Sequence, residues 1–215
     1  KAIYDDLRPY EKELPDFETF RANGGYKYKI NSTVIAFKEQ IEDPDNHPFP
    51  TPSGKIEIFS ERLYKLNQPE DIPAIPKYVP SFEGVGDPLM EKYPLQMIGW
   101  HTKRRTHSTH DCNKKLERIE KQQAWINEKD AKVRRIENGE LVEIWNDRGK
   151  LRIPAFVTSR IIPGVIAVPQ GAWYTPDKNG VDQRGSINVL TTSRPTPLAK
   201  GNPQHSNLVE VKLAE

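Results

Sequence analysis

The sequence predicts a mainly β protein whose second half closes into a β-barrel. Short apolar runs recur after residue 93 and are separated by turn residues, which is the pattern of strands in a small barrel. Apolar residues make up only 35% of the 215 residues and 19 prolines interrupt the chain, so we expect a modest core. The formal net charge is only +2, which disfavours a protein that binds nucleic acid over its whole surface.

The first half is expected to be irregular, with a few short elements. Asp16 is placed to cap a helix that ends at the glycines of residues 24–25, and Ser60 is placed to cap another over residues 61–66. Residues 67–92 hold five prolines and two glycines, so we interpret them as a linker and place the domain boundary there. Short strands are predicted over residues 34–37 and 56–59.

The second half has clearer patterning. Asn127 is a plausible N-cap for a helix over residues 128–136, with Ala131, Ile136 and Val133 facing inward. Residues 113–123 are charged and could also be helical, and residues 124–126 form a brief apolar insertion. Strands are predicted over residues 95–98, 141–145, 151–157, 165–168 and 208–211, the second and third forming a hairpin.

Residues 101–110, which we call the cationic loop, follow the first of these strands. The loop holds three histidines, two arginines and a lysine among hydroxyl side chains, and no carboxylate. A strand that leads into such a loop is a common way to hold an anion, so a phosphate-bearing cofactor is one interpretation. A metal site, a nucleic-acid contact and an exposed loop without a ligand remain alternatives, although adjacent arginines oppose a divalent cation.

A second polar region follows the strand at residues 165–168. Gly171 permits a close backbone approach, Trp173 and Tyr174 offer flat faces, and Asn188 can donate and accept at the edge of a heterocycle. These aromatic residues could equally belong to the core. Cys112 is the single cysteine, so an intrachain disulfide and a CxxC motif are excluded. No nucleophile–base pair or pair of catalytic carboxylates stands out.

Several of these motifs together resemble the C-terminal, molybdopterin-dinucleotide-binding domain of the dimethyl sulfoxide reductase family, in particular the catalytic subunits of its anaerobic members. The resemblance covers about two-thirds of the chain, chiefly residues 49–60 and 93–212. It rests on the YPL…HTKRRTHS stretch from Tyr93 to Ser108, the residues Ile136 to Gly149, Gly171-Ala172-Trp173, Asn188-Val189-Leu190-Thr191, and the tail from Pro197 to Asn207.

The resemblance implies a six-stranded double-psi β-barrel of the aspartate-decarboxylase-like type with short helices, preceded by an irregular α+β segment. Residues 1–90 would be the tail of a preceding oxidoreductase domain and a linker, and residues 91–215 the cofactor-binding domain. The implied cofactor is bis(molybdopterin guanine dinucleotide). By position, its binding residues would be His101, Lys103, Arg104, Arg105, Thr106, His107, Ser108, Gly171, Trp173, Asn188, Leu190, Thr191, Lys200 and Gly201.

The resemblance also implies that this chain is part of a longer enzyme that reduces sulfoxides or N-oxides. The molybdenum ligand and a cysteine-bound 4Fe-4S cluster would lie in other parts of that enzyme, so we expect no catalytic residue here and no turnover by this chain alone. Expected partners are the rest of the catalytic subunit, an iron–sulfur electron-transfer subunit and a membrane anchor subunit, without nucleic acid. Export by the twin-arginine route is expected for the whole enzyme.

Overall fold

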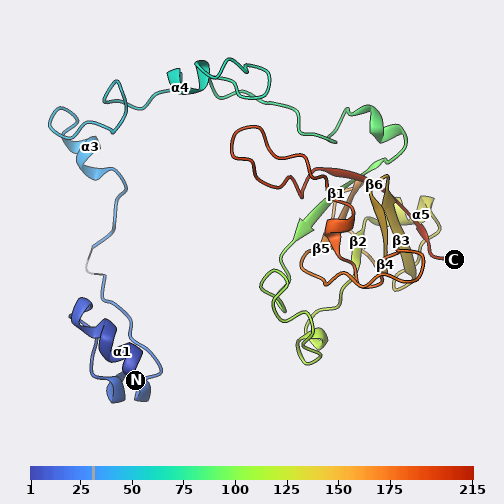
Figure 1. Cartoon of the computed structure of the whole chain (residues 1–215), viewed down its shortest axis with the longest axis horizontal. Coiled ribbons are helices and arrows are strands. Elements are labelled where there is room, and N and C mark those ends of the chain that lie inside the picture. The colour runs from blue at the N-terminus through green and yellow to red at the C-terminus, as the bar shows by residue number, and fades with distance from the viewer. Residues whose placement is uncertain (31) are drawn as a thin grey trace. The chain divides into compact units, whose positions relative to one another are not determined.

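The computed structural model describes residues 1–30 and 32–215 and divides the chain into two compact units, Lys1–Ile58 and Phe59–Glu215 (Figure 1). It confirms the predicted fold class, because six strands of the second unit form a closed barrel with only short helices around them. Whether the barrel has double-psi topology, and whether residues 1–90 belong to a preceding domain, stay predictions. No helix among the described residues is long and apolar enough to cross a bilayer.

Apart from residue 31, which is not described, the first unit contains only short helices, α1 (Ala2–Leu7), η1 (Arg8–Tyr10), α2 (Phe17–Ala22) and α3 (Lys38–Glu42). The Asp16 cap is confirmed, since its carboxylate accepts hydrogen bonds from the backbone and hydroxyl of Thr19. The strands predicted over residues 34–37 and 56–59 are wrong. All strands of the described residues lie after residue 94, so neither apolar run has a partner strand, and Val34 and Ile56 are exposed.

The second unit begins with α4 (Glu61–Tyr64) and a long segment without strands that ends in η2 (Pro88–Glu91). The Ser60 cap is confirmed by its hydroxyl, which accepts a hydrogen bond from the Leu63 backbone. The helix ends earlier than predicted. The end of the long segment is attached to the barrel by Glu83, which pairs with both terminal nitrogens of Arg148 and accepts from the Leu208 backbone.

The barrel strands are β1 (Leu95–Trp100), β2 (Ala124–Ile126), β3 (Leu141–Asn146), β4 (Gly149–Val157), β5 (Val165–Pro169) and β6 (Asn207–Leu213). Their order around the barrel is β1-β5-β2-β4-β3-β6. β1 pairs in parallel with β5, and β2 with β4, whereas the other described pairings are antiparallel. The predicted β3–β4 hairpin and the other strands predicted after residue 93 are confirmed, and the apolar insertion at residues 124–126 is itself a strand.

The core fills the inside of the barrel. Alternate residues of β1 are buried, as expected for a strand with one face inward, and Met97 at its centre is fully enclosed. Ile126, Ile144, Leu151 and Ile166 reach the same core from four other strands. This apolar interior is the rigid support for the loops at the barrel ends.

Two predictions for the connection between β1 and β3 need correction. Residues 113–123 form turns and the short η3 (Leu116–Arg118) and not a regular helix. The Asn113 side chain accepts from the backbones of Lys115 and Leu116 and so starts this single helical turn. Asn127 does cap α5 (Glu128–Val133), but this helix is shorter than predicted and Val133 points to solvent.

Truncating Met97 should destabilise the barrel. Met97→Ala removes a fully buried side chain, so we expect a loss of about 2–5 kcal/mol in the free energy of unfolding, measured by urea denaturation of the chain. Ile162→Ala is the matched control, because Ile162 is largely exposed and should change this free energy by less than about 0.5 kcal/mol. Equal effects would contradict the core described here.

Candidate functional site

The loops that carry most of the predicted site residues leave the barrel together. β1 and β5 are parallel neighbours with Trp100 opposite Pro169, so the chain segments that follow them emerge at the same end. The Gln170 backbone donates to the Trp100 carbonyl at 3.0 Å and continues this pairing into the loops. η4 (Ile187–Val189) and the segment before β6 complete this end of the barrel.

Gly171 makes the contact between the two loops possible. Its φ of +90° is unfavourable for other residues, and a Cβ atom there would lie 1.8 Å from the carbonyl oxygen of His107. The close backbone approach expected from the sequence is therefore confirmed, and its partner is the cationic loop itself.

Trp173 donates two hydrogen bonds, one to the cationic loop and one to Asp111, which follows that loop. Its indole Nε1 donates to the Ser108 carbonyl at 2.9 Å, and its backbone N–H donates to the Asp111 carboxylate at 3.0 Å. The ring itself remains half exposed. It forms one side of an open hollow of about 460 Å³, which we call the aromatic shelf and which is lined by Ser108, Ala172, Trp173, Tyr174, Ser186, Asn188 and Val189.

The shelf brings together three residues that the sequence placed in a binding site, Ser108, Trp173 and Asn188. Two aromatic side chains stand beside hydroxyl groups and one exposed amide. Flat apolar faces with a few polar groups at the edge suit a planar heterocycle.

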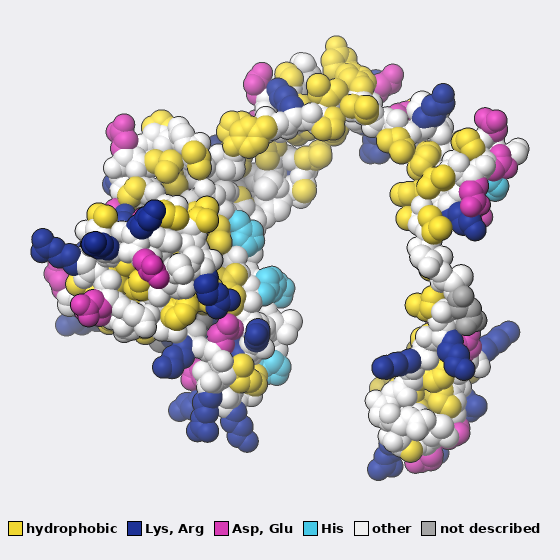
Figure 2. Space-filling model, turned by 180° about the vertical axis from the view of Figure 1, so that it is seen from behind, with side chains coloured by type: hydrophobic (Ala, Val, Ile, Leu, Met, Phe, Trp, Pro, Cys, Tyr) yellow, Lys and Arg dark blue, Asp and Glu magenta, His cyan; other side chains and the backbone are white. Residues whose placement is uncertain are grey.

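The exposed polar side chains of the cationic loop are a second feature of this end. His101, Lys103 and His107 are exposed, and the rings of the two histidines meet edge to face at a centroid distance of 5.0 Å. Thr106 is also exposed. Figure 2 shows histidine side chains gathered along one edge of this unit. Among the described residues, these histidines take part in no cluster that could hold a metal ion.

Arg104 and Arg105 lie differently from the other cations of the loop, because both side chains are almost fully buried. Arg105 donates to Asp111 Oδ1 at 2.6 Å, to Gln122 Oε1 at 2.6 Å and to the Gln170 carbonyl at 2.9 Å. Burial lowers the pKa of Arg105, an effect that the Asp111 hydrogen bond opposes. No local sequence pattern indicated that these two side chains would turn inward.

Asp111 is the carboxylate that pairs with these two arginines. Besides Arg105, it pairs with Arg184 through Oδ2 at 2.8 Å and with Arg104 at 3.5 Å. Burial acts to raise the pKa of Asp111, but hydrogen bonds from the Trp173 backbone, Arg105 and Arg184 outweigh it and hold that pKa below its ordinary value. Asp111 and Arg184 were missed from the sequence because only the fold brings them together.

Buried donors without a partner cluster around the same loop. They belong to the last residue of β1 and to residues that follow β1 or β5, and nearly all can only donate hydrogen bonds. Acceptor-rich groups, such as a phosphate or a pterin ring, suit donors of this kind, but all six atoms are buried and none is open to the shelf. The atoms are Trp100 Nε1, Thr102 Oγ1, Arg104 Nε and Nη1, Arg105 Nε and Gln170 Nε2.

The segment before β6 is joined to this end through its side chains. His205 Nδ1 accepts from the Gly99 backbone at 3.2 Å, and Gln204 Nε2 donates to Gln170 Oε1 at 2.7 Å. Lys200 and Gly201 line a separate polar pocket of about 250 Å³ with Thr192 and Arg194. Ser108, Trp173 and Asn188 therefore line one hollow, Lys200 and Gly201 line another, and the remaining predicted site residues line neither.

Leu190 and Thr191 contribute differently. The Leu190 side chain belongs to the barrel core, and its carbonyl accepts from Asn146 Nδ2 and Arg148 Nε. Thr191 is half-buried, and its hydroxyl donates to the Asn188 carbonyl at 3.3 Å. Both residues support the segment that carries Asn188.

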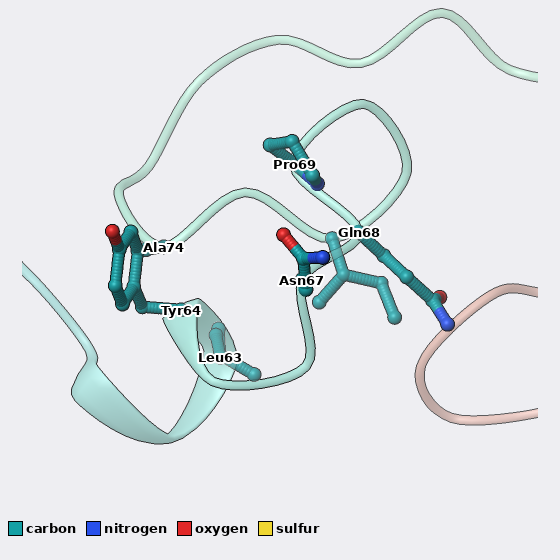
Figure 3. Close-up of a pocket in the computed structure, with 7 residues that line it drawn as sticks. Leu63, Tyr64, Asn67, Gln68, Pro69 and Ala74 are labelled. Atoms are coloured by element: carbon teal, nitrogen blue, oxygen red, sulfur yellow. The ribbon is translucent and has the colours of Figure 1, made fainter.

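A further pocket lies away from these loops, beside α4. It is lined by Leu63, Tyr64, Asn67, Gln68, Pro69, Ile72 and Ala74, and Figure 3 shows these side chains. Its volume of about 60 Å³ is enough for a few water molecules but not for a cofactor, and no predicted site residue lines it.

Gly171→Ala should lower the free energy of unfolding much more than Gly139→Ala. Both glycines have a φ of +90°, but only Gly171 has a backbone oxygen where the new Cβ would lie. We expect backbone strain in Gly139→Ala to lower the free energy of unfolding by about 1–2 kcal/mol. Gly171→Ala should lower it by at least about 2 kcal/mol more, as measured by urea denaturation. Equal losses would show that the loop moves aside without cost.

The contribution of Asp111 to stability should depend on pH. A carboxylate whose folded-state pKa is lowered stabilises the fold above its unfolded-state pKa, and this contribution disappears as pH falls through the folded-state pKa. We expect Asp111→Asn to cost about 3–5 kcal/mol at neutral pH, because it leaves buried arginines uncompensated. The difference from the original chain should shrink below pH 3.8, the ordinary pKa. A difference that is constant down to pH 2 would contradict this role.

Comparison with known proteins identifies the barrel with a described family. The model of the family described as the molydopterin dinucleotide binding domain matches residues 95–208. The dimethyl sulfoxide reductase DmsA of Haemophilus influenzae is 51% identical over 99% of this chain, and DmsA of Escherichia coli K12 is 48% identical over 99%. Trimethylamine-N-oxide reductase 1 of E. coli K12 is 35% identical over 93%. This chain spans only about a quarter of these relatives, 25–27% of their length.

The solved structure of acetylene hydratase from Pelobacter acetylenicus has a similar fold. The TM-score is 0.67 over 93% of this chain and 28% of that one, at 20% sequence identity. At this identity the likeness supports the fold alone.

Proposed function

This chain belongs to the molybdopterin dinucleotide-binding domain family, and from this premise we propose that it is the cofactor-binding C-terminal portion of a molybdenum-dependent reductase. The whole enzyme would reduce dimethyl sulfoxide or a related S- or N-oxide. The observation that carries the proposal is that the family match covers the barrel and that the loops at one barrel end form a shelf with aromatic faces beside exposed cations.

The proposed cofactor is bis(molybdopterin guanine dinucleotide). The residues present fit it, because its phosphates need cations and donors and its ring systems need flat faces. Lys103, His101 and His107 would pair with phosphate, Trp173 would contact a ring, and Asn188 would hydrogen-bond to a heterocycle edge. Lys200 and Gly201 would contribute donors from the second pocket.

When bound, the cofactor would supply oxygen-atom transfer and two-electron chemistry. We assign no catalytic residue and no molybdenum ligand to this chain. Its residues would bind and orient the cofactor, and its core would keep their loops in place. We therefore expect no turnover by the 215-residue chain alone.

Further parts of the enzyme are proposed on the same basis. A 4Fe-4S cluster held by four cysteines would lie outside this chain, which contains one cysteine. An iron–sulfur electron-transfer subunit and a membrane anchor subunit are the proposed partners, and the enzyme would be exported by the twin-arginine route.

The first test is the identity of the ligand released from the full-length protein that carries this chain. Mass spectrometry should find a guanine-containing pterin, and its absence from a folded protein would refute the proposed function.

The assigned residues can then be tested by substitution in the full-length protein. Lys103→Gln and Asn188→Ala each remove one contact, so we expect cofactor to be released about tenfold faster, as followed by pterin fluorescence. Arg118→Gln is the control for loss of a charge, because Arg118 is exposed in η3 and lines neither hollow. Equal release rates in all three variants would contradict the assignment of Lys103 and Asn188.

A further inference from the structure

Asp111 connects the two loops that build the site, and it does so with both carboxylate oxygens. Oδ1 faces the cationic loop, where it accepts from Arg105 at 2.6 Å and from Arg104 at 3.5 Å. Oδ2 faces the shelf, where it accepts from the Trp173 backbone at 3.0 Å and from Arg184 at 2.8 Å. The carboxylate has no exposed surface. One buried charge therefore fixes the distance between the cationic loop and Trp173.

The charges around Asp111 form a closed group. Arg104 and Arg184 also lie 3.9 and 3.6 Å from Glu117 Oε1, so three arginines share two carboxylates. The side chains of Arg104 and Arg105 are each only 1% exposed. Arg104 Nε and Nη1 and Arg105 Nε have no hydrogen-bond partner, but all three atoms are buried. For either guanidinium to contact an anion on the shelf, it would have to move and leave a buried carboxylate without its partner, which is strongly unfavourable.

We propose that Asp111 is a positioning residue for the cofactor, and that Arg104, Arg105 and Arg184 act through it and not as phosphate ligands. This inference rests on the proposed function and revises the direct role that the resemblance suggested for Arg104 and Arg105. Asp111 holds Trp173 and Ser108 in place to form the shelf, while the exposed residues of the cationic loop contact the anion.

Two opposite expectations distinguish positioning from direct binding. If the arginines were ligands, Asp111→Asn would leave their charge uncompensated and would strengthen or preserve cofactor binding. If Asp111 positions the shelf, the same substitution loosens Trp173 and weakens binding. Arg184→Gln is a milder perturbation of the same carboxylate. The Arg184 side chain is 36% exposed and contacts Asp111 from the surface.

The experiment uses the full-length protein that carries this chain, with its cofactor. Molybdenum content and the rate of pterin release are measured for the original protein and for Asp111→Asn, Arg184→Gln, Arg105→Gln and the double variant Asp111→Asn with Arg105→Gln. Arg118→Gln is the control for charge, because Arg118 is exposed and contacts neither Asp111 nor the shelf. Folding of each variant is checked by thermal unfolding.

We expect about tenfold faster pterin release for Asp111→Asn and Arg184→Gln, and wild-type release for Arg118→Gln. The double variant should release cofactor more slowly than Asp111→Asn alone, because removing Arg105 relieves the uncompensated charge. Release that is unchanged or slower in Asp111→Asn, or unchanged in Arg184→Gln, would overturn the inference.

Two outcomes separate this inference from the proposed function. If Asp111→Asn does not fold, Arg184→Gln decides the question, since it leaves the other contacts of Asp111 intact. If the original full-length protein contains no guanine pterin, the proposed function itself fails. If it contains the cofactor but the Asp111 and Arg184 variants retain it normally, only the positioning role fails.

Discussion

β1 and β5 run parallel and adjacent, so the segments that follow them leave the barrel side by side. The contacts between these two segments depend on this pairing. It places Gly171 against the His107 carbonyl. It also places Trp173 against Ser108, although these two residues are 65 positions apart in the sequence. A parallel pair cannot be joined by a tight turn, and here the connection between β1 and β5 contains β2, β3 and β4. The two loops of the site are therefore brought together by the barrel and not by a local turn.

Burial then decides which charges can meet a ligand. Consecutive residues of the cationic loop differ in burial. Lys103 is exposed, whereas Arg104 and Arg105 are buried and pair with Asp111. A buried guanidinium needs a carboxylate and hydrogen-bond acceptors, and Asp111, Gln122 and the Gln170 carbonyl provide them. The same carboxylate holds the Trp173 backbone, so the shelf and the inward charges form one unit. The cations that remain outside are left for an anion.

Local sequence patterns correctly predicted two kinds of element. These are the helix starts, which depend on neighbouring residues, and the strands whose apolar residues pack inside the barrel. Asp16, Ser60 and Asn127 all cap helices as expected, because a cap is decided by its immediate neighbours. The β3–β4 hairpin also followed from a polar turn between two apolar runs. The apolar runs at residues 34–37 and 56–59 look alike in sequence but form no strand, because a strand requires a partner that this part of the chain does not supply.

The sequence by itself determined the mainly β class, the helix caps, the position of the cationic loop and the types of residue that could bind a phosphate-bearing heterocycle. These follow from periodicity, turn chemistry and side-chain charge, which are properties of neighbouring residues. Only the tertiary structure decided that Ser108, Trp173 and Asn188 share one shelf, and that Asp111 and Arg184 meet across 73 residues. The physical reason is that strand order and burial depend on contacts between distant segments, and these contacts select which charges are neutralised inside and which stay available to a ligand.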